Sequence, residues 1–157
     1  MDPIQELIEI EKIKRLRARY WRTLDTKDWD GFGNVWTQDA TFQIDTAVAT
    51  FGGDPVTTPI ISGRANIVAT VQSLLKDCLT VHTGRAPEID ILSETEAKAI
   101  WQQEDYNEWP QRFNHGHGHY HDTYRKENGE WLISSVHLTR LRMVDTHRQV
   151  SLTPRFN

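Results

Sequence analysis

Residues 18–42, ARYWRTLDTKDWDGFGNVWTQDATF, decide how this chain folds. The segment ends a predicted helix, passes through a turn and enters a predicted first strand. Tyr20 and Asp25 lie five residues apart beside that turn, so a phenol and a carboxylate share the junction. A single carboxylate at a helix end carries little information by itself. We therefore expect polar residues from later in the chain to return to this junction.

The residues before the junction predict a long amphipathic helix. Asp2, Pro3 and Gln5 form its start, because Asp caps a first turn, Pro suits the first helical position and Gln closes a capping box. Apolar side chains then recur at helical spacing, and we expect all of them to face the core: Ile4, Leu7, Ile8, Ile13, Leu16 and Tyr20.

Two further helices, a strand and a loop are predicted after the junction. A short helix is expected over residues 29–36, and residues 39–45 alternate as a strand. Residues 47–59 follow neither period, which predicts a long loop of the kind that often covers a binding site. A helix over residues 65–76 follows, with a buried side expected to contain Ile67, Val68, Val71, Leu74 and Leu75.

The second half of the chain predicts a β-meander. Its strand candidates are Leu79–Ala86, Glu88–Leu92, Glu96–Trp109, Asn114–Lys126 and Trp131–Val144. Asn128 and Gly129 favour a tight hairpin between the last two. A curved sheet that buries one face must wrap around helices, so the expected class is α+β: a cone-shaped barrel of a mixed or antiparallel sheet and about three helices. We expect one domain over residues 1–145 and an exposed tail over residues 146–157.

Composition excludes several classes of protein. The formal net charge of −4 and the absence of a long basic run argue against nucleic acid as a partner. The single cysteine, Cys78, excludes an intramolecular disulfide framework and suits a reducing compartment. The start, MDPIQELIEI, resembles neither a signal peptide nor a membrane span, so a cytoplasmic protein is expected. Six Trp residues fit an apolar cavity or an oligomer face.

Strand alternation selects the candidate pocket residues, because every second side chain of a strand points to the same face. Gly116 and Gly118 share a face with one of these candidates, Tyr120, and leave room beside it. Together with Tyr20 and Asp25 of the junction, the predicted inner face contains His82, Trp101, Gln103, Asp105, Tyr120, Arg140 and Arg142.

Over about residues 5–145, the chain resembles the SnoaL-like group of the nuclear-transport-factor-2-like superfamily. The segment VWTQDATF resembles the family's entry into the first strand, W-x-x-D-A-x-aromatic. Asp25 matches the family's aspartate at a helix end, and His82, in LTVHTG, matches its catalytic histidine. The resemblance extends to bile acid 7α-dehydratase, scytalone dehydratase and γ-hexachlorocyclohexane dehydrochlorinase, which are lyases without a cofactor.

Other positions match only some of these relatives. Tyr20 and Asp105 match a tyrosine and a catalytic aspartate of the bile acid enzyme. The catalytic arginine of the dehydrochlorinase falls on Val136, so either Arg140 or Arg142 is left to supply that charge.

The resemblance implies a dehydratase that needs no cofactor and acts on a small hydrophobic molecule, either alicyclic, steroid-like or an aromatic polyketide. His82 would be the general base, oriented by Asp25. Tyr20 would stabilise negative charge on the substrate, and Asp105 or Tyr120 would protonate the departing hydroxyl. The substrate-binding residues would be Trp101, Gln103, Tyr120, Arg140 and Arg142.

Two alternatives remain open at this stage. An isomerase or a polyketide cyclase could use the same base without loss of water. A ligand-binding protein, or a subunit like the small subunit of ring-hydroxylating dioxygenases, would have no need of the Asp25 and His82 pair.

The run HGHGHYH, which starts at His115, presents histidines at every second position. Two or three such side chains on one strand face could bind a metal ion. The run faces away from the predicted pocket, however, and the related lyases need no metal. We therefore expect no metal, and we expect the convex face of the sheet to form a homodimer or homotrimer.

Overall fold

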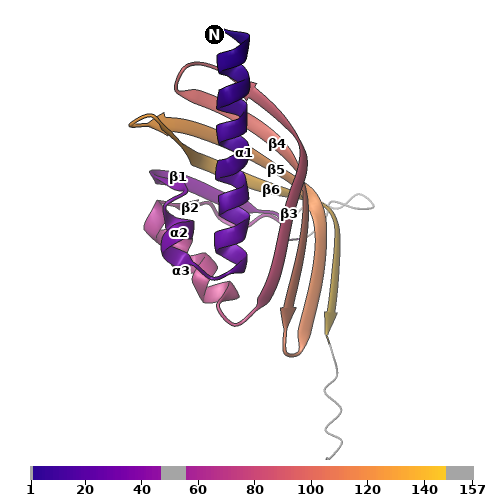
Figure 1. Cartoon of the computed structure of the whole chain (residues 1–157). Helices are drawn as coiled ribbons and strands as arrows, with labels where there is room; N and C mark the ends of the chain where they lie inside the picture. Colours follow the sequence, from indigo (N-terminus) through magenta and orange to yellow (C-terminus); the bar gives the residue numbers. More distant parts are fainter. Residues whose placement is uncertain (1, 47–55, 148–157) are drawn as a thin grey trace, which may run out of the picture.

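A computed structural model describes residues 2–46 and 56–147 of the chain (Figure 1). Within these residues the predicted α+β class is confirmed, with three helices and six strands. Their bounds are α1 Pro3–Asp25, α2 Trp29–Gly33, β1 Trp36–Ile44, β2 Ile61–Ser62, α3 Arg64–Leu75, β3 Leu79–Ile91, β4 Glu96–Trp109, β5 Arg112–Glu127 and β6 Glu130–His147. No helix in the described ranges has the length and apolarity needed to cross a membrane.

The strands form one curved sheet in the order β2-β1-β6-β5-β4-β3. β1 and β6 run parallel, whereas the other neighbouring pairs are antiparallel, so the sheet is mixed. Figure 1 shows α1 lying across the concave side of the sheet, with α2 and α3 packed beside its C-terminal half. The buried core lies between this side of the sheet and the helices.

Only the second half of the apolar stripe of α1 enters the core. Ile13, Leu16 and Tyr20 are buried as predicted. The prediction is wrong for the first turns, since Ile4 and Leu7 are 69% and 66% exposed, and Ile8 is also exposed. The reason is the side of the helix on which they lie: these three side chains point away from the sheet, beside Glu11 and Arg15, whereas Glu9 of the same turns points toward it.

A buried carboxylate anchors the middle of α1 to the β5–β6 hairpin. Glu9 is 2% exposed and accepts hydrogen bonds from Trp131 Nε1 at 2.6 Å, Gln5 Nε2 at 2.7 Å and Lys12 Nζ at 3.0 Å. Lys126 Nζ lies 2.6 Å from Glu9 Oε2, the oxygen that Trp131 also binds. Burial alone raises the pKa of Glu9, but the hydrogen bonds from Lys126, Lys12 and Trp131 outweigh it and lower that pKa to about 2.

The Glu9→Gln variant is expected to be less sensitive to acid than the natural chain. Because the folded pKa of Glu9 is depressed, its contribution to stability is present above about pH 4.5 and is lost as the pH falls toward about 2. The difference in free energy of unfolding between the two proteins should therefore shrink from pH 7 to pH 3 by on the order of 2 kcal/mol. Urea unfolding at both pH values measures it. A difference that is equal at the two pH values would contradict this assignment.

Several predicted element bounds need correction. The short helix ends at Gly33 and not at Trp36, because Asn34 caps it and Trp36 already starts β1. Leu74 of α3 is 59% exposed, so the expectation that it faces the core is wrong. The two strands predicted between Leu79 and Leu92 are the single strand β3, whose register shifts between Arg85 and Glu88.

Other predictions concern the loop and the tail. Residues 47–55 of the predicted loop and residues 148–157 of the predicted tail lie outside the described residues. The rest of the loop region forms a bridge between Asp45 and Thr57. The hairpin predicted at Asn128 and Gly129 is confirmed, since their φ angles of 51° and 84° are those that an Asn-Gly turn accommodates.

Candidate active site

Asp25 and His82 meet as the sequence predicted. Asp25 is the last residue of α1, and His82 lies in the edge strand β3. His82 Nδ1 lies 2.7 Å from Asp25 Oδ1, and the backbone N–H of His82 donates to Asp25 Oδ2 at 2.8 Å. Because a carboxylate only accepts hydrogen bonds, Nδ1 carries the proton and Nε2 is left with a free lone pair. The contact therefore fixes both the orientation and the tautomer of the imidazole.

A third residue holds the carboxylate in place. The Thr80 hydroxyl donates to Asp25 Oδ1 at 2.8 Å and accepts a hydrogen bond from Lys27 Nζ at 2.8 Å. Lys27 has a φ of 61°, a left-handed conformation that turns the chain sharply after α1. No role was predicted for Thr80 or Lys27 from the sequence. The alternation of β3 could have indicated Thr80, which is two residues before His82 and shares its face.

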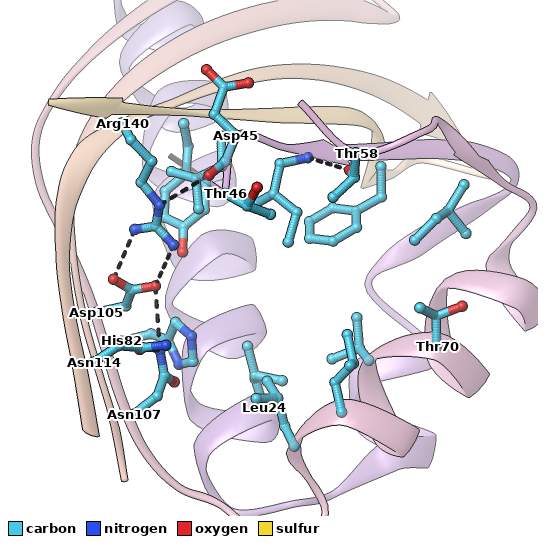
Figure 2. A pocket seen from close by; sticks show the side chains of 18 of the residues that line it. Leu24, Asp45, Thr46, Thr58, Thr70, His82, Asp105, Asn107, Asn114 and Arg140 are labelled. Carbon is cyan, nitrogen blue, oxygen red and sulfur yellow. Dashed lines mark hydrogen bonds and ion pairs between the residues drawn. The ribbon is translucent and has the colours of Figure 1, made fainter. Parts of the chain in front are cut away.

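His82 is one wall residue of a cavity of about 470 Å³ between the sheet and the helices. Figure 2 shows that the wall is divided, with Asp105, His82 and Asn107 on the sheet side and Leu24 and Thr70 on the helices opposite. The apolar part of the lining is larger and includes Leu24, Phe42, Ile44, Ile61, Val71, Leu74, Leu75, Leu138 and Met143. The cavity therefore suits a molecule with an apolar body and one polar end.

Asp105 and Arg140 form a buried ion pair in the sheet-side wall. Arg140 Nη1 donates to Asp105 Oδ1 at 2.8 Å, and Nη2 donates to Oδ2 at 2.7 Å. Burial raises the pKa of Asp105, but the hydrogen bonds and the charge of Arg140 outweigh it, so that pKa lies below its usual range. Asp105 is therefore ionised at neutral pH. The prediction that it stays protonated and gives a proton to the departing hydroxyl is wrong.

Gly116 makes space for this ion pair. It pairs with Asp105 across β4 and β5, and a Cβ at this position would collide with Asp105 Oδ1 and Arg140 Nη1. The room that the sequence predicted beside Tyr120 is filled at Gly116 by Arg140, whereas a Cβ at Gly118 would collide with the backbone carbonyl of Thr139.

The Gly116→Ala variant is expected to lose the geometry of the ion pair and about 1–3 kcal/mol of stability, because an added methyl group has no room. Gly33→Ala is the matched control, since its Cβ would meet Val68 Cγ2 at an ordinary 3.5 Å. Thermal unfolding of both variants measures the difference. Equal melting temperatures for the two would show that the ion pair tolerates the methyl group.

Two tyrosines from different elements line the cavity above a buried cation. Tyr20 of α1 and Tyr120 of β5 are both lining residues, and the Arg17 guanidinium carbon lies 4.1 Å from the centroid of each ring. Burial raises the pKa of Tyr20 to about 12 and that of Tyr120 well above its usual value. Both phenols are therefore protonated at neutral pH and can donate hydrogen bonds. Arg17 was missed in the sequence, where it is one charge among several on the helix.

Three predicted binding residues lie outside the cavity lining. Trp101 is buried behind it, where its Nε1 donates to the Tyr124 hydroxyl at 2.9 Å. Gln103 is also buried, and its Oε1 accepts a hydrogen bond from Arg140 Nη1 at 3.1 Å, so it supports the ion pair. Arg142 is exposed on the outer face.

The position of Arg142 results from a β-bulge. Gly118 pairs with Arg140, and the residue before it in β5, His117, pairs with Arg142. Leu141 is therefore an extra residue in β6. One extra residue reverses the alternation of the strand. Arg140 consequently faces the cavity and Arg142 does not. Met143, beyond the bulge, lines the cavity in its place.

Two asparagines were missed in the sequence. Asn107 Nδ2 donates to Asn114 Oδ1 at 2.9 Å, and both residues line the cavity beside Asp105. Asn107 Oδ1 has no hydrogen-bond partner among the described residues, although it is buried. The signal was available, because Asn107 follows Asp105 by two residues and shares its face.

Comparisons with known proteins agree with this geometry. A sequence profile of the SnoaL-like domain matches residues 5–137. The protein named Probable cyclase FGR4, from Gibberella zeae, is 29% identical over 136 residues, which cover 82% of this chain and 89% of that protein.

Solved structures share the fold at lower identity. A candidate scytalone dehydratase from Novosphingobium aromaticivorans has a TM-score of 0.75 at 22% identity, over 92% of this chain and 91% of that one. The hexachlorocyclohexane dehydrochlorinase LinA-type3 from Novosphingobium barchaimii has a TM-score of 0.73 at 14% identity, over 91% and 93% of the two chains. Because the profile match covers most of its length, the chain belongs to the SnoaL-like domain family.

Proposed function

We propose that this protein is a lyase that removes water from a small hydrophobic alcohol without a cofactor. The observation that carries the proposal is the hydrogen bond of 2.7 Å between Asp25 and His82 on the wall of an otherwise largely apolar cavity. A neutral imidazole with its Nδ1 proton held by a carboxylate is a general base at Nε2 near neutral pH.

The proposed reaction starts with a proton on a carbon next to a carbonyl or a conjugated system. His82 Nε2 takes this proton, and Asp25 stabilises the imidazolium that forms. Negative charge builds on the substrate oxygen and is stabilised by the protonated hydroxyl of Tyr20 or Tyr120. The C–O bond then breaks as the double bond forms, and the departing hydroxide takes the proton from His82. Water leaves and the imidazole returns to its neutral form.

The ion pair has a different role in this proposal from the one that the sequence indicated. Since Asp105 is ionised and both of its oxygens are bound by Arg140, neither group is free to transfer a proton. The pair instead gives the polar wall a fixed arrangement next to His82, which is the cross-strand neighbour of Asp105. We infer that it orients the polar end of the substrate toward the base.

The lining supports a substrate class. An apolar body, either alicyclic, steroid-like or an aromatic polyketide, would fill the side lined by Phe42, Val71 and Leu138, and its oxygen-bearing end would face His82. Two predictions about the whole molecule accompany this proposal and stay predictions: a cytoplasmic location and a homodimer or homotrimer formed through the convex face.

A cyclase or an isomerase is the second candidate, and the observation that favours it is the similarity over 136 residues to a protein named as a cyclase. Both would use His82 as the same base, but neither would release water. If the protein only binds a ligand and does not catalyse a reaction, that ligand would occupy the same cavity.

A product analysis separates these candidates. The purified chain is incubated with a panel of hydroxylated cyclic ketones and polyketide alcohols, and the products are measured by mass spectrometry in normal and deuterated water. Loss of the mass of water supports the dehydratase. Unchanged mass with a new retention time, or deuterium incorporation without loss of water, favours the cyclase or isomerase. Saturable binding of panel compounds with no conversion would contradict the enzymatic proposal.

A further inference from the structure

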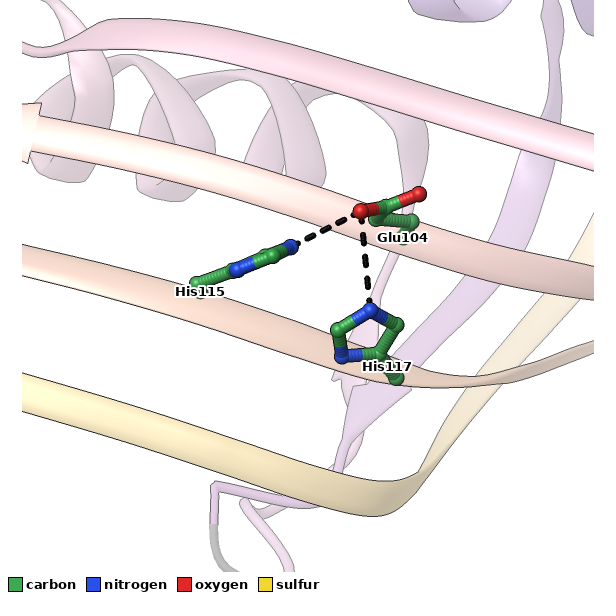
Figure 3. Close-up of side chains that lie close together, drawn as sticks. All are labelled: Glu104, His115 and His117. Atoms are coloured by element: carbon green, nitrogen blue, oxygen red, sulfur yellow. Dashed lines mark hydrogen bonds and ion pairs between the residues drawn. The ribbon is translucent and has the colours of Figure 1, made fainter.

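Three side chains with metal-binding atoms converge on the outer face of the sheet, away from the cavity (Figure 3). Glu104 Oε1 lies 2.8 Å from His115 Nε2 and 3.5 Å from His117 Nε2. The three ligand atoms all lie within 4.8 Å of one another. Two imidazole nitrogens and one carboxylate oxygen thus surround a common point.

The strand register creates this group. Glu104 of β4 pairs directly with His117 of β5, and His115 is the diagonal neighbour on the same face. Alternation along β4 sends Asp105 to the cavity and Glu104 to the opposite face. The group is therefore built on two central, paired strands and is separate from the proposed catalytic residues.

The environment of each side chain favours a ligand role. Arg85 binds the other oxygen of Glu104, Oε2, which orients the carboxylate and leaves Oε1 toward the histidines. His117 presents Nε2 to the group, 3.5 Å from Glu104 Oε1. All three side chains are about one-third exposed, with values of 32%, 32% and 35%.

We propose that Glu104, His115 and His117 bind a divalent transition-metal ion, with Zn²⁺ as the best match. Zn²⁺ binds imidazole nitrogen and carboxylate oxygen at about 2.0–2.2 Å, which in a tetrahedral site puts ligand atoms about 3.3 Å apart. The distances of 2.8 and 3.5 Å to Glu104 Oε1 lie on either side of that value. The site has three protein ligands and an open fourth position toward solvent. The ion would link β4 to β5 and take no part in the cavity's chemistry.

The histidine run alone did not predict this site, because the third ligand comes from the neighbouring strand. From the sequence alone we expect no metal, because the run faces away from the predicted pocket and the related lyases need none. That orientation is what brings His115 and His117 to Glu104.

Binding of Zn²⁺ to the full chain, first freed of metal with a chelator, tests the proposal. Calorimetry should give one Zn²⁺ per chain, and Co²⁺ at the same site should give the visible absorption of a tetrahedral complex. His117→Ala and Glu104→Gln should each weaken Zn²⁺ binding by at least about 10- to 100-fold, since even the loss of a residue that only orients a ligand costs that much. His119→Ala is the matched control, since His119 is the next outward-facing histidine of β5 and does not belong to the group.

Each result decides the matter. Far-UV circular dichroism and the melting temperature without metal establish that each variant is folded. A Zn²⁺-dependent rise in melting temperature that is present in the natural chain and His119→Ala, and absent in His117→Ala, supports the site. No binding by the natural chain, or equal losses in His117→Ala and His119→Ala, would overturn it, because the second result indicates only general binding to exposed histidines.

Discussion

Replacing His82 with Gln is expected to lower the rate of water elimination by about 10²- to 10⁴-fold, the usual contribution of a positioned general base. Gln keeps much of the size and polarity of the side chain but cannot accept a proton near neutral pH. Because the cavity lining stays otherwise intact, KM should change less than kcat. A fall confined to KM would indicate that His82 binds the substrate and does not act as the base.

Asp25→Asn provides a second measurement on the same pair. The Asn amide can donate a hydrogen bond to His82 Nδ1, so the variant allows the tautomer whose proton is on Nε2. In that tautomer Nε2 cannot take a proton from the substrate. We expect kcat to fall while the cavity still binds the substrate. His119→Ala, on the opposite face of the sheet, serves as the control for both variants. Turnover by His82→Gln that equals that of the control would contradict the mechanism.

Replacing Arg17 with Met is expected to cost about 3–5 kcal/mol of the free energy of unfolding, the usual cost of leaving one member of a buried ion pair without its partner. The Arg17 and Asp122 side chains are both 0% exposed, and Arg17 Nε lies 3.1 Å from Asp122 Oδ2. None of the three guanidinium nitrogens has a hydrogen-bond partner among the described residues, so Arg17 is held by this charge and by the rings of Tyr20 and Tyr120.

The pH dependence of the Arg17→Met variant identifies the cause. Burial already raises the pKa of Asp122, and Arg17 opposes that rise, so removal of Arg17 should raise the pKa further. A folded pKa above the unfolded value means that the folded state binds more protons, and stability then increases as the pH falls. The loss measured by urea unfolding should therefore be larger at pH 8 than at pH 5.

A double variant completes the test. Arg17→Met with Asp122→Asn removes both charges, and it should recover a substantial part of the lost stability because no buried charge is left unpaired. The Tyr124 hydroxyl, which donates to Asp122 Oδ2 at 2.6 Å, can donate to the Asn oxygen as well. A double variant that is less stable than Arg17→Met would contradict this account, and would indicate that Arg17 acts mainly through its packing.

The fold could be predicted well from the sequence because its signals are local. The strand over residues 96–109 was predicted with the bounds that β4 has, and the Asn128 and Gly129 turn fixes the last hairpin. Errors arose where contacts with another element determine which residues are buried. Ile4 and Leu7 are apolar but lie on the side of α1 opposite to Ile13. The core-facing position in those turns is filled by Glu9, because Trp131 and Lys126 of the last hairpin bind its carboxylate.

The candidate site was predictable where alternation is unbroken. Asp25 and His82 were brought together by the match to a family, and the structure places them in contact. Arg142 could not be excluded, because the bulge at Leu141 is a property of the pairing between β5 and β6. The ionisation of Asp105 was equally inaccessible, since it depends on the distance to Arg140, a residue 35 positions away in the sequence.

The order of the strands has a consequence for folding during synthesis. β1 lies next to β6, with Trp36 paired to Ile133, so β1 cannot form this pairing until β6 has been synthesised. In this sheet β1 and β2 join β5, β4 and β3 only through β6. Until the ribosome has released β6, β1 has no place in the sheet, and its hydrogen-bonding edge stays uncovered. A nascent chain that stalls before residue 130 would hold two separate β-units, and chaperones that shield unpaired strands should engage it at that length.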